Sequence, residues 1–472
     1  MYRKLLIVII LLFAALFRLQ AHPFNAAHYI VVDTDGGIDD YRALCLLLSA
    51  PDVRIIAVTA SAGVLPAELV AKKARALLDL FHHEGIPVAI NNRLTAKGMG
   101  CGPAHDFRWG NEEKLSSVDF LSLDSLGSWL QLNLKKKVTY IALGSLSTVI
   151  SLHEGFPELS KNTASVLWSS EAGETFGGFN HRLDPGLTDR LSSLPVPLRV
   201  VQGEGHYSTT FPERLNEIWS ETAVAFEQSF CTTTAASPFG MRAYDEMTVL
   251  YLHYPESFER TENEGVVKIH LQPETDIEQL IANVLSEFNL QSSQLFSRFP
   301  TDKAAFQADL QPVADSILHL HGMQEWVSVV NSFELHRHIG VYALVGAKMG
   351  TRALEYFGAG IDEAEVLSLA GSGPPISCLN DGIQVSTGAT LGHGLIRVSE
   401  ENPRVAAVFT YMNQRVEFRL KEQYSQQIKT EIGQLVKQHG LESSRYWDEV
   451  RQLALRYWLM MDRHTMFEIV KR

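Results

Sequence analysis

Short apolar runs alternate with amphipathic stretches through the first half of the chain. Apolar residues recur at helical spacing over 39–49 and again after Pro66, where Leu69, Leu77 and Leu78 share one side. The intervening runs are rich in β-branched and aliphatic residues, which predicts buried parallel strands at Tyr29–Asp33, Arg54–Ala60, Val138–Leu143, Ser165–Trp168 and Leu198–Val201. This alternation predicts an α/β fold, with a mainly parallel sheet and helices on both of its faces.

The second half of the chain has a different pattern. Residues 273–325 are mostly polar and helical without strand signals, which indicates a helical connector. Residues 326–472 mix strand and helix patterns and end in two predicted long helices, roughly Arg415–His439 and Ser443–Val470. A chain of 472 residues is too long for one ordinary core, and 46% hydrophobic with 20% charged residues indicates a globular protein. We therefore expect a second, α+β domain in this half.

The first 21 residues have the pattern of a secretory signal peptide. Arg3 and Lys4 precede the apolar run Leu5–Phe17, and Ala21 is a small residue at the expected cleavage point. A membrane anchor is the alternative, but this run is shorter than the roughly 20 residues that a span needs. We therefore expect an exported protein, periplasmic or extracellular, with residues 1–21 removed and no stable membrane span after cleavage.

The acidic charge of the chain limits its partners. The formal net charge is -13, and it becomes -16 when residues 1–21 leave with Arg3, Lys4 and Arg18. Because a strongly acidic surface repels polyanions, a nucleic acid is not an expected partner. The four cysteines are widely spaced without a CxxC pair, so one disulfide could form in an oxidising compartment among Cys45, Cys101, Cys231 and Cys378.

Four aspartates are crowded where the first predicted strand ends, in the sequence IVVDTDGGIDDYRALCLLL of residues 31–49. Carboxylates this close repel one another unless a cation, a shared proton or water relieves the repulsion. A helix N-cap would explain Asp39 or Asp40, which stand where a helix begins, but it would not explain Asp33 and Asp35 as well. The cluster therefore predicts a bound partner.

Three kinds of site have aspartates in such a pattern. An EF-hand loop that starts at Asp33 would need oxygen ligands at its fifth and twelfth positions, which are Gly37 and Leu44. A phosphatase of the haloacid dehalogenase type also begins with Asp-x-Asp after a strand, but the threonine expected next is Gly37, and Asp39 and Asp40 would have no role. The third kind is a preformed calcium site at a strand-to-helix junction, where carboxylates from both sides of the turn converge.

The same aspartates carry a resemblance to a known family. Residues 33–40 resemble the signature of the inosine/uridine-preferring nucleoside hydrolases, with Gly36 where that family usually has proline. Four ordered matches make chance a poor explanation. The resemblance therefore predicts a nucleoside hydrolase-like domain over residues 28–272. The three later matches are residues 141–148, the segment Gly178-Phe179-Asn180 with Asp184-Pro185, and the pair Tyr244-Asp245.

The resemblance implies a calcium-dependent hydrolase that cleaves the N-glycosyl bond of a small-molecule substrate, a nucleoside or a related glycoside. Calcium would lower the pKa of a bound water, and Asp35 would take the proton of that water. Asp39 and Asn180 would contact sugar hydroxyls, and Tyr244 replaces the histidine that helps the base to leave in some members. The implied calcium ligands are Asp35, Asp40, the backbone carbonyl of Leu143 and Asp245.

Three sugar-binding side chains of that family are missing from this chain. Val64 replaces an asparagine, Gly178 replaces a glutamate, and the loop over 169–177 is short and lacks a further asparagine. Such a site would read sugar hydroxyls poorly, and the short loop would leave room for a bulkier substituent or for side chains of the second domain. An alternative therefore stays open: a non-catalytic exported protein that binds a metal or a metal complex on a decayed hydrolase scaffold.

The second region resembles the E-type domain of formylmethanofuran dehydrogenase. The matching stretches are residues 333–340, 346–350 and 378–392. The resemblance covers about residues 326–395 and implies a metal-binding module, which we assign to residues 326–472. Imidazole and thiolate are donors suited to zinc. The implied ligands are His336, His338 and Cys378, with His393 as a potential fourth.

A structural explanation competes with a metal in the second region. Histidines two apart on a strand point to opposite faces, and a lone cysteine is more often a small buried apolar residue than a ligand. Gly340 and Ala389 stand where many members of that family have cysteines. The aromatic pairs Tyr446-Trp447 and Tyr457-Trp458 predict helix packing or the surface of a homo-oligomer rather than a cofactor site.

Overall fold

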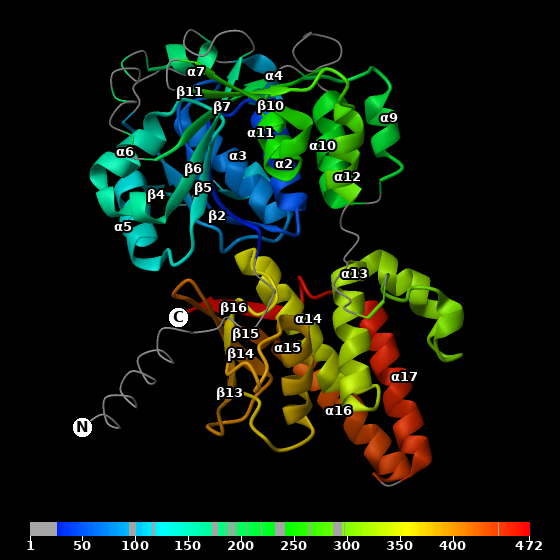
Figure 1. The fold of residues 1–472 in the computed structure, drawn as a ribbon. Helices are drawn as coiled ribbons and strands as arrows, with labels where there is room; N and C mark the ends of the chain where they lie inside the picture. The colour runs from blue at the N-terminus through cyan, green and yellow to red at the C-terminus, as the bar shows by residue number, and fades with distance from the viewer. Residues whose placement is uncertain are drawn as a thin grey trace, which may run out of the picture.

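The computed structural model contains two domains, one above the other in the view of Figure 1. The predicted signal peptide, residues 1–21, and residues 172–177 of the short loop lie outside the described residues. The structure describes residues 26–472 apart from 94–100, 116–118, 172–177, 185, 187–189, 191–193, 195, 204, 219, 232–240, 264–265, 287–294, 297 and 442.

The first domain is built on a nine-stranded sheet, which confirms the predicted α/β fold. Neighbouring strands are parallel except for the pair β10 and β11 at one edge. All five strands predicted from the sequence are present. In spatial order the strands are β10 (Phe258–Asn263), β11 (Val266–Leu271), β7 (Leu198–Gly203), β6 (Thr163–Glu171), β5 (Val138–Ala142), β1 (His28–Thr34), β2 (Val53–Ala60), β3 (Val88–Ile90) and β4 (Leu121–Ser122).

Helices cover both faces of this sheet (Figure 1). Strand β1 shows the reason, because its side chains alternate between two cores: Ile30 and Val32 enter one, and Val31 enters the other. The first core also contains side chains of α2 (Ile38–Ser49), α3 (Ala67–Leu80), α9 (Phe211–Leu215), α10 (Glu221–Cys231) and α11 (Glu246–His253), and the second contains side chains of α5 (Leu123–Asn133) and α6 (Ser147–Gly155).

The region expected to be a connector divides between the two domains. Helix α12 (Ile277–Ser286) is part of the first domain, since its buried Ile277, Ile281 and Leu285 lie in the first core. These apolar residues recur every four positions, which is the stripe of a packed helix, although the surrounding sequence is polar. Helix α13 (Gln311–His336) begins well before residue 326 and belongs to the second domain, where it packs on α14 (Val341–Phe357).

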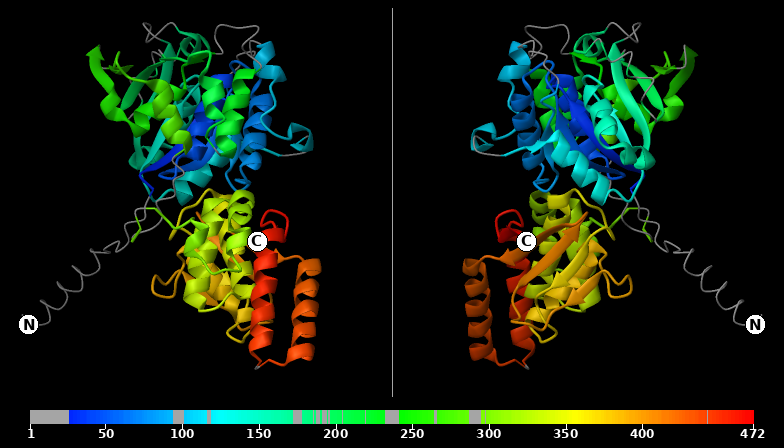
Figure 2. Two further views of the ribbon diagram at one scale, coloured as in Figure 1. Left: turned by 90° about the vertical axis from the view of Figure 1, so that its right-hand side faces the viewer. Right: turned by 90° about the vertical axis from the view of Figure 1, so that its left-hand side faces the viewer.

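The second domain combines a five-stranded sheet with helices, as the α+β expectation requires. Its predicted last helices are shorter than expected. Val416, Phe418 and Leu420 are buried with the period of two that a strand requires, and α17 ends before a last strand. The remaining elements are β12 (Glu365–Ser368), α15 (Leu379–Thr387), β13 (Ile396–Val398), β14 (Ala406–Tyr411), β15 (Gln414–Leu420), α16 (Glu422–His439), α17 (Ser444–Met460) and β16 (Phe467–Lys471). Helices α16 and α17 lie side by side at one flank (Figure 2).

Two further sequence features can be followed in the structure. Within the described residues, no helix combines the length and the apolar character that crossing a membrane requires. The thiols of Cys45, Cys101 and Cys378 are free, whereas the side chain of Cys231 is outside what the structure describes.

The second domain contacts the edge of the large sheet at which its parallel strands begin. Tyr29 at the start of β1 donates its hydroxyl to Glu363 Oε1 at 2.7 Å, and Arg54 at the start of β2 donates to Glu363 Oε2 at 2.9 Å. Ahead of β3, the Gly85 amide donates to the Tyr356 carbonyl at 2.8 Å. Because Asp33, Asp35 and their neighbours follow the other end of β1, the aspartate cluster faces away from the second domain.

A pair of histidines is stacked in this interface. The His82 ring lies parallel to the His464 ring, with centroids 3.5 Å apart, and Arg352 donates to the His82 carbonyl at 3.0 Å. Burial, followed by the nearby charge of His464, lowers the pKa of His82 from 6.5 to about 4. Arg352 also opposes its protonation, whereas Glu355 and Glu84 favour it. The docked arrangement therefore requires a neutral His82 at neutral pH.

We expect acid to weaken the protein through this histidine. As the pH falls from about 6.5 to about 4, the unfolded chain binds a proton at His82 that the folded chain does not bind, so the free energy of unfolding should fall across that window. His82→Asn should flatten this dependence, because asparagine does not titrate and tolerates the positive φ of 62° at this position. Denaturant unfolding at pH 7.5, 5.5 and 4.5 measures the effect, and equal slopes for the two proteins would contradict it.

Candidate active site

Asp33 anchors the end of strand β1. Its Oδ1 accepts from the Thr59 hydroxyl at 2.6 Å and its Oδ2 from the Ser61 hydroxyl at 3.0 Å. The register of the sheet explains this contact, because Asp33 lies opposite Thr59 in the parallel pair β1 and β2. Burial raises the pKa of Asp33 to about 7. With both oxygens engaged by hydroxyls, Asp33 fixes the turn, which is the supporting role expected for it.

Asp40 closes the turn that follows. Its Oδ1 accepts from the Thr34 hydroxyl at 2.6 Å and from the Asp35 amide at 2.9 Å, and its Oδ2 accepts from the Gly37 amide at 3.1 Å. Gly36 has a φ of 96°, a conformation that glycine adopts without strain. Burial, and after it the charge of Asp39, raises the pKa of Asp40 to about 6. The first turn of α2 is therefore built around one buried carboxylate.

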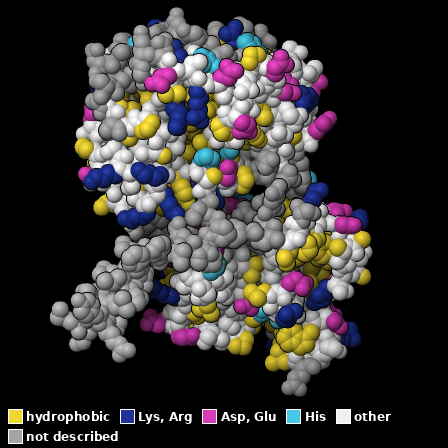
Figure 3. Space-filling model, in the orientation of Figure 1, with side chains coloured by type: hydrophobic (Ala, Val, Ile, Leu, Met, Phe, Trp, Pro, Cys, Tyr) yellow, Lys and Arg dark blue, Asp and Glu magenta, His cyan; other side chains and the backbone are white. Residues whose placement is uncertain are grey.

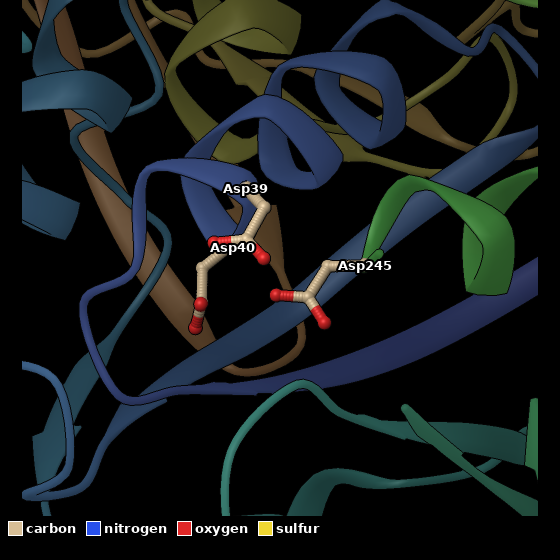
Figure 4. Close-up of side chains that lie close together, drawn as sticks. All are labelled: Asp39, Asp40 and Asp245. Atoms are coloured by element: carbon tan, nitrogen blue, oxygen red, sulfur yellow. The ribbon is translucent and has the colours of Figure 1, made fainter. Parts of the chain in front are cut away.

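Three carboxylates converge beside this turn. Asp39, Asp40 and Asp245 each place an oxygen within 4.8 Å of the others, and their side chains point toward one another in Figure 4. Asp39 and Asp40 open α2, and Asp245 immediately precedes α11. Burial is the main cause that raises the pKa of Asp245, and the charges of Asp39 and Asp40 raise it further. Such a group of acids is held together at neutral pH by a cation.

Asp35 lies beside this group in a tight cradle. It is 1% exposed, and its Oδ2 has no hydrogen-bond partner among the described residues. Burial, and after it the charges of Asp40, Asp39 and Asp33, raises the pKa of Asp35 well above its usual range. A Cβ at Gly144 would lie 2.8 Å from the Asp35 Cβ, and one at Gly63 would collide with its carboxylate. An unpartnered buried oxygen next to three more carboxylates fits a hard divalent cation such as calcium.

The structure distributes the predicted calcium ligands differently from the expectation. Asp39, predicted to contact a sugar hydroxyl, lies with Asp40 and Asp245 in the group of three, whereas Asp35 is outside that group. The Leu143 carbonyl accepts from Asn180 Nδ2 at 2.6 Å. A carbonyl oxygen has two lone pairs, so Leu143 keeps one for a cation.

The predicted substrate contacts are partly engaged with the protein itself. Asn180 Nδ2 also donates to the Ser169 carbonyl at 3.3 Å, so its amide faces two backbone carbonyls. The half-buried Tyr244 accepts at its Oη from Arg242 Nη1 at 2.9 Å, directly next to Asp245. Val64 packs against the first core and offers no polar side chain where the related proteins were expected to have asparagine.

Sequence reasoning missed a buried ion pair behind the carboxylates. Arg42 Nε donates to Glu246 Oε1, and both side chains are almost completely buried. Tyr207 donates its hydroxyl to the same oxygen at 2.8 Å, and the Arg42 guanidinium lies over the Phe230 ring at 5.0 Å. The signal was present, because Arg42 interrupts an apolar helical face and Glu246 follows Asp245 directly. The Arg42 charge also lowers the pKa of Asp39, although burial raises it more.

In the second domain His336 and His338 come together. They lie at the end of helix α13 and just after it, not on a strand, because Arg337 turns the chain with a φ of 65°. Their ring centroids are 4.2 Å apart, and a Cβ at Gly340 would lie 3.2 Å from both Nε2 atoms. His336 Nδ1 contacts Asp381 Oδ2 at 2.6 Å, while its buried Nε2 has no hydrogen-bond partner among the described residues. This arrangement is typical of an oriented metal ligand.

The other two predicted donors of the second domain do not join the histidine pair in a set of three. Apart from Asp39, Asp40 and Asp245, the described part of the chain contains no group of three histidine, cysteine or acidic side chains with metal-binding spacing. His393 Nδ1 instead contacts Asp362 Oδ1 at 3.1 Å and the Gly388 carbonyl at 2.9 Å. Burial raises the pKa of the half-buried Cys378, which precedes helix α15.

Comparison with known proteins identifies both parts of the chain. Residues 30–307 match the family described as inosine-uridine preferring nucleoside hydrolase. The chain belongs to this nucleoside hydrolase family. Residues 335–467 match a second family, described as FmdE, molybdenum formylmethanofuran dehydrogenase operon. Both resemblances expected from the sequence are thus confirmed.

The similar proteins are distant and cover the nucleoside hydrolase part. Probable uridine nucleosidase 2 of Arabidopsis thaliana is 24% identical, over 61% of this chain and 96% of its own length. The non-specific ribonucleoside hydrolase RihC of Salmonella paratyphi A is 27% identical, over 50% of this chain and 82% of its own. The crystal structure of an inosine-uridine preferring nucleoside hydrolase from Bacillus anthracis is 14% identical with a TM-score of 0.45, covering 55% of this chain and 99% of its own.

Proposed function

We propose that the protein is an exported, calcium-dependent hydrolase that cleaves the N-glycosyl bond of a nucleoside or a related glycoside. The observation that carries this proposal is the group of buried, mutually repelling carboxylates beside Asp35 and its unpartnered Oδ2. Buried charges need a compensating charge, and a set of oxygen donors alone is what calcium prefers. The distant relatives support the same reaction class, because those named above are a nucleosidase and a ribonucleoside hydrolase.

Each side chain of the site then has a distinct task. Asp35, Asp40, Asp245 and the Leu143 carbonyl would hold the calcium, and Asp39 lies close enough to Asp40 to join them. When bound, calcium would orient a water molecule and lower its pKa. Asp35 would accept the proton of that water at its Oδ2, which no protein group occupies among the described residues. Tyr244 would stand near the leaving base, with its hydroxyl oriented by Arg242.

A second candidate function is a non-catalytic protein that binds a metal or a metal complex. The contacts of Asn180 favour it, because the amide that should grip the sugar instead donates to the carbonyls of Leu143 and Ser169. Val64 adds to this argument, since it cannot replace an amide that bonds a hydroxyl. The carboxylates would then serve binding alone.

We also propose that the second domain binds a divalent metal such as zinc through His336 and His338. Support comes from the convergence of both Nε2 atoms near Gly340 and from the Asp381 contact that leaves His336 Nε2 available. Cys378 is a further donor on the neighbouring helix end.

Export remains a proposal that rests on residues 1–21. The mature protein should begin near residue 22, which mass spectrometry of protein from the extracytoplasmic fraction measures directly. An intact N-terminus in that fraction would show a membrane anchor instead.

The catalytic proposal predicts calcium-dependent release of nitrophenol from p-nitrophenyl riboside, a substrate whose good leaving group needs little help. Asp35→Asn should lower kcat by about 10²–10⁴-fold, because asparagine cannot accept the proton of the attacking water. Asp315→Asn is the matched control, since the side chain of Asp315 is 73% exposed. Calcium binding without release of nitrophenol would reject the hydrolase and favour the binding protein.

A further inference from the structure

A pocket of about 350 Å³ lies beside the histidine pair of the second domain. Apolar side chains gather in this part of the molecule, over α13, α16 and α17, in Figure 3. The pocket is formed by the turn between α13 and α14 and by one face of α17. Its lining residues are His338, Ile339, Trp447, Asp448 and Arg451. The proposed function above gives this pocket no role.

The wall of the pocket offers a flat aromatic surface. Trp447 is 48% exposed, and the His338 ring meets it nearly edge to face, with centroids 5.4 Å apart and an angle of 79° between the rings. Tyr446 supports the indole from the side, at 5.1 Å between centroids. An indole that is fixed by two rings and still half in solvent can stack with a planar ligand at little entropic cost.

The charges at the pocket select against an anion. Arg451 donates to Asp309 through both Nε and Nη2, at 2.5 and 2.8 Å, so its charge is already compensated. Asp448 adds an exposed carboxylate to the wall. The pocket therefore suits a neutral planar molecule that can donate an N–H to a carboxylate oxygen.

The histidine pair connects this pocket to the proposed metal. Because His338 is shared between the pair and the pocket wall, a metal held by the two Nε2 atoms would lie at the inner end of the pocket. In the described part of the chain, no third histidine, cysteine or acidic side chain completes the pair with metal-binding spacing. A zinc ion takes four ligands, so positions would stay open toward the pocket.

We propose that this pocket binds an aromatic nitrogen heterocycle, such as a purine base, that stacks on Trp447 and ligates a metal held by His336 and His338. The proposal rests on the metal site proposed for the second domain. A ligand of this class is also what a nucleoside hydrolase releases. Because the aspartate cluster faces away from the second domain, the heterocycle would reach the pocket through solvent.

The test uses the whole mature protein loaded with Co²⁺ in excess calcium, which keeps Co²⁺ out of the oxygen-rich site. Adenine is the probe, since the visible spectrum of Co²⁺ reports a change in its ligands. Adenine should change the spectrum and quench tryptophan fluorescence over the same concentration range. Trp447→Leu should raise the Kd for adenine about 5- to 100-fold, as loss of one base-stacking contact does, and leave the bound Co²⁺ unchanged. Trp129→Leu, at a half-buried tryptophan of the first domain, is the control and should change neither.

The outcomes separate the two proposals. His336→Ala should lower Co²⁺ affinity and abolish the spectral response to adenine. Co²⁺ that binds in a His336-dependent manner but keeps its spectrum at millimolar adenine would overturn the heterocycle site and leave the metal site standing. No His336-dependent Co²⁺ binding would overturn both.

Discussion

Asp40→Asn should remove most of the calcium affinity of the first domain. Asparagine keeps the size of the side chain and one oxygen for the Thr34 hydroxyl and the Asp35 amide, so the turn before α2 can still form. It removes one negative charge from the group that Asp40 shares with Asp39 and Asp245. If the Kd for calcium rises 100-fold, the stabilisation at a calcium concentration of 100 Kd for the parent protein falls by about 2.3 kcal/mol.

The measurement is the free energy of unfolding with calcium and with a chelator, for the parent protein and for the variant. The difference between the two conditions isolates the bound ion from any effect of the substitution on the turn itself. Asp315→Asn, far more exposed, should keep the full calcium-dependent difference. If Asp40→Asn left both the calcium content and this difference unchanged, the metal site would be assigned to the wrong residues.

The elements found from the sequence share one property: their buried side chains repeat with a simple period. The strands of the large sheet were found because they are continuous apolar runs, as parallel strands covered on both faces must be. Strand β15 was mistaken for the start of a helix, since Gln414–Leu420 directly precedes the charged start of α16. Helix α12 was overlooked because its apolar stripe is only one residue wide within a polar segment.

The site was found in outline because its residues follow one strand end. The aspartates of residues 33–40 are adjacent in sequence, so their crowding was visible without a structure. Which of them meet Asp245 depends on how α11 approaches the turn, and that is a tertiary contact that no local pattern encodes. The meeting of His336 and His338 likewise depends on the left-handed conformation of Arg337, a residue with no intrinsic preference for it.

Ordinary purine and pyrimidine ribosides should be poor substrates compared with p-nitrophenyl riboside. Three sugar-binding side chains of the family are absent, and Asn180 is engaged with backbone carbonyls. A hydrogen bond to a charged group contributes about 1.5–3 kcal/mol, and bonds that strengthen in the transition state act on kcat as well as on binding. We therefore expect kcat/KM for inosine and uridine to be low by several orders of magnitude. Robust inosine hydrolysis that Asp35→Asn abolishes would refute this and make the protein an ordinary nucleoside hydrolase.

Restoring one of the missing contacts tests the reason for the poor activity. Val64 follows the cradle glycine Gly63 beside Asp35, and it is half-buried, so a side chain of similar size can be placed there. Val64→Asn should raise kcat/KM for inosine about tenfold, the effect of roughly 1.4 kcal/mol, because the amide can bond a sugar hydroxyl. Val64→Leu, similar in size but apolar, should give no gain. Equal activity of the two variants would show that the side chain at this position does not reach the sugar, and the low activity would then have to come from the altered loop and Asn180.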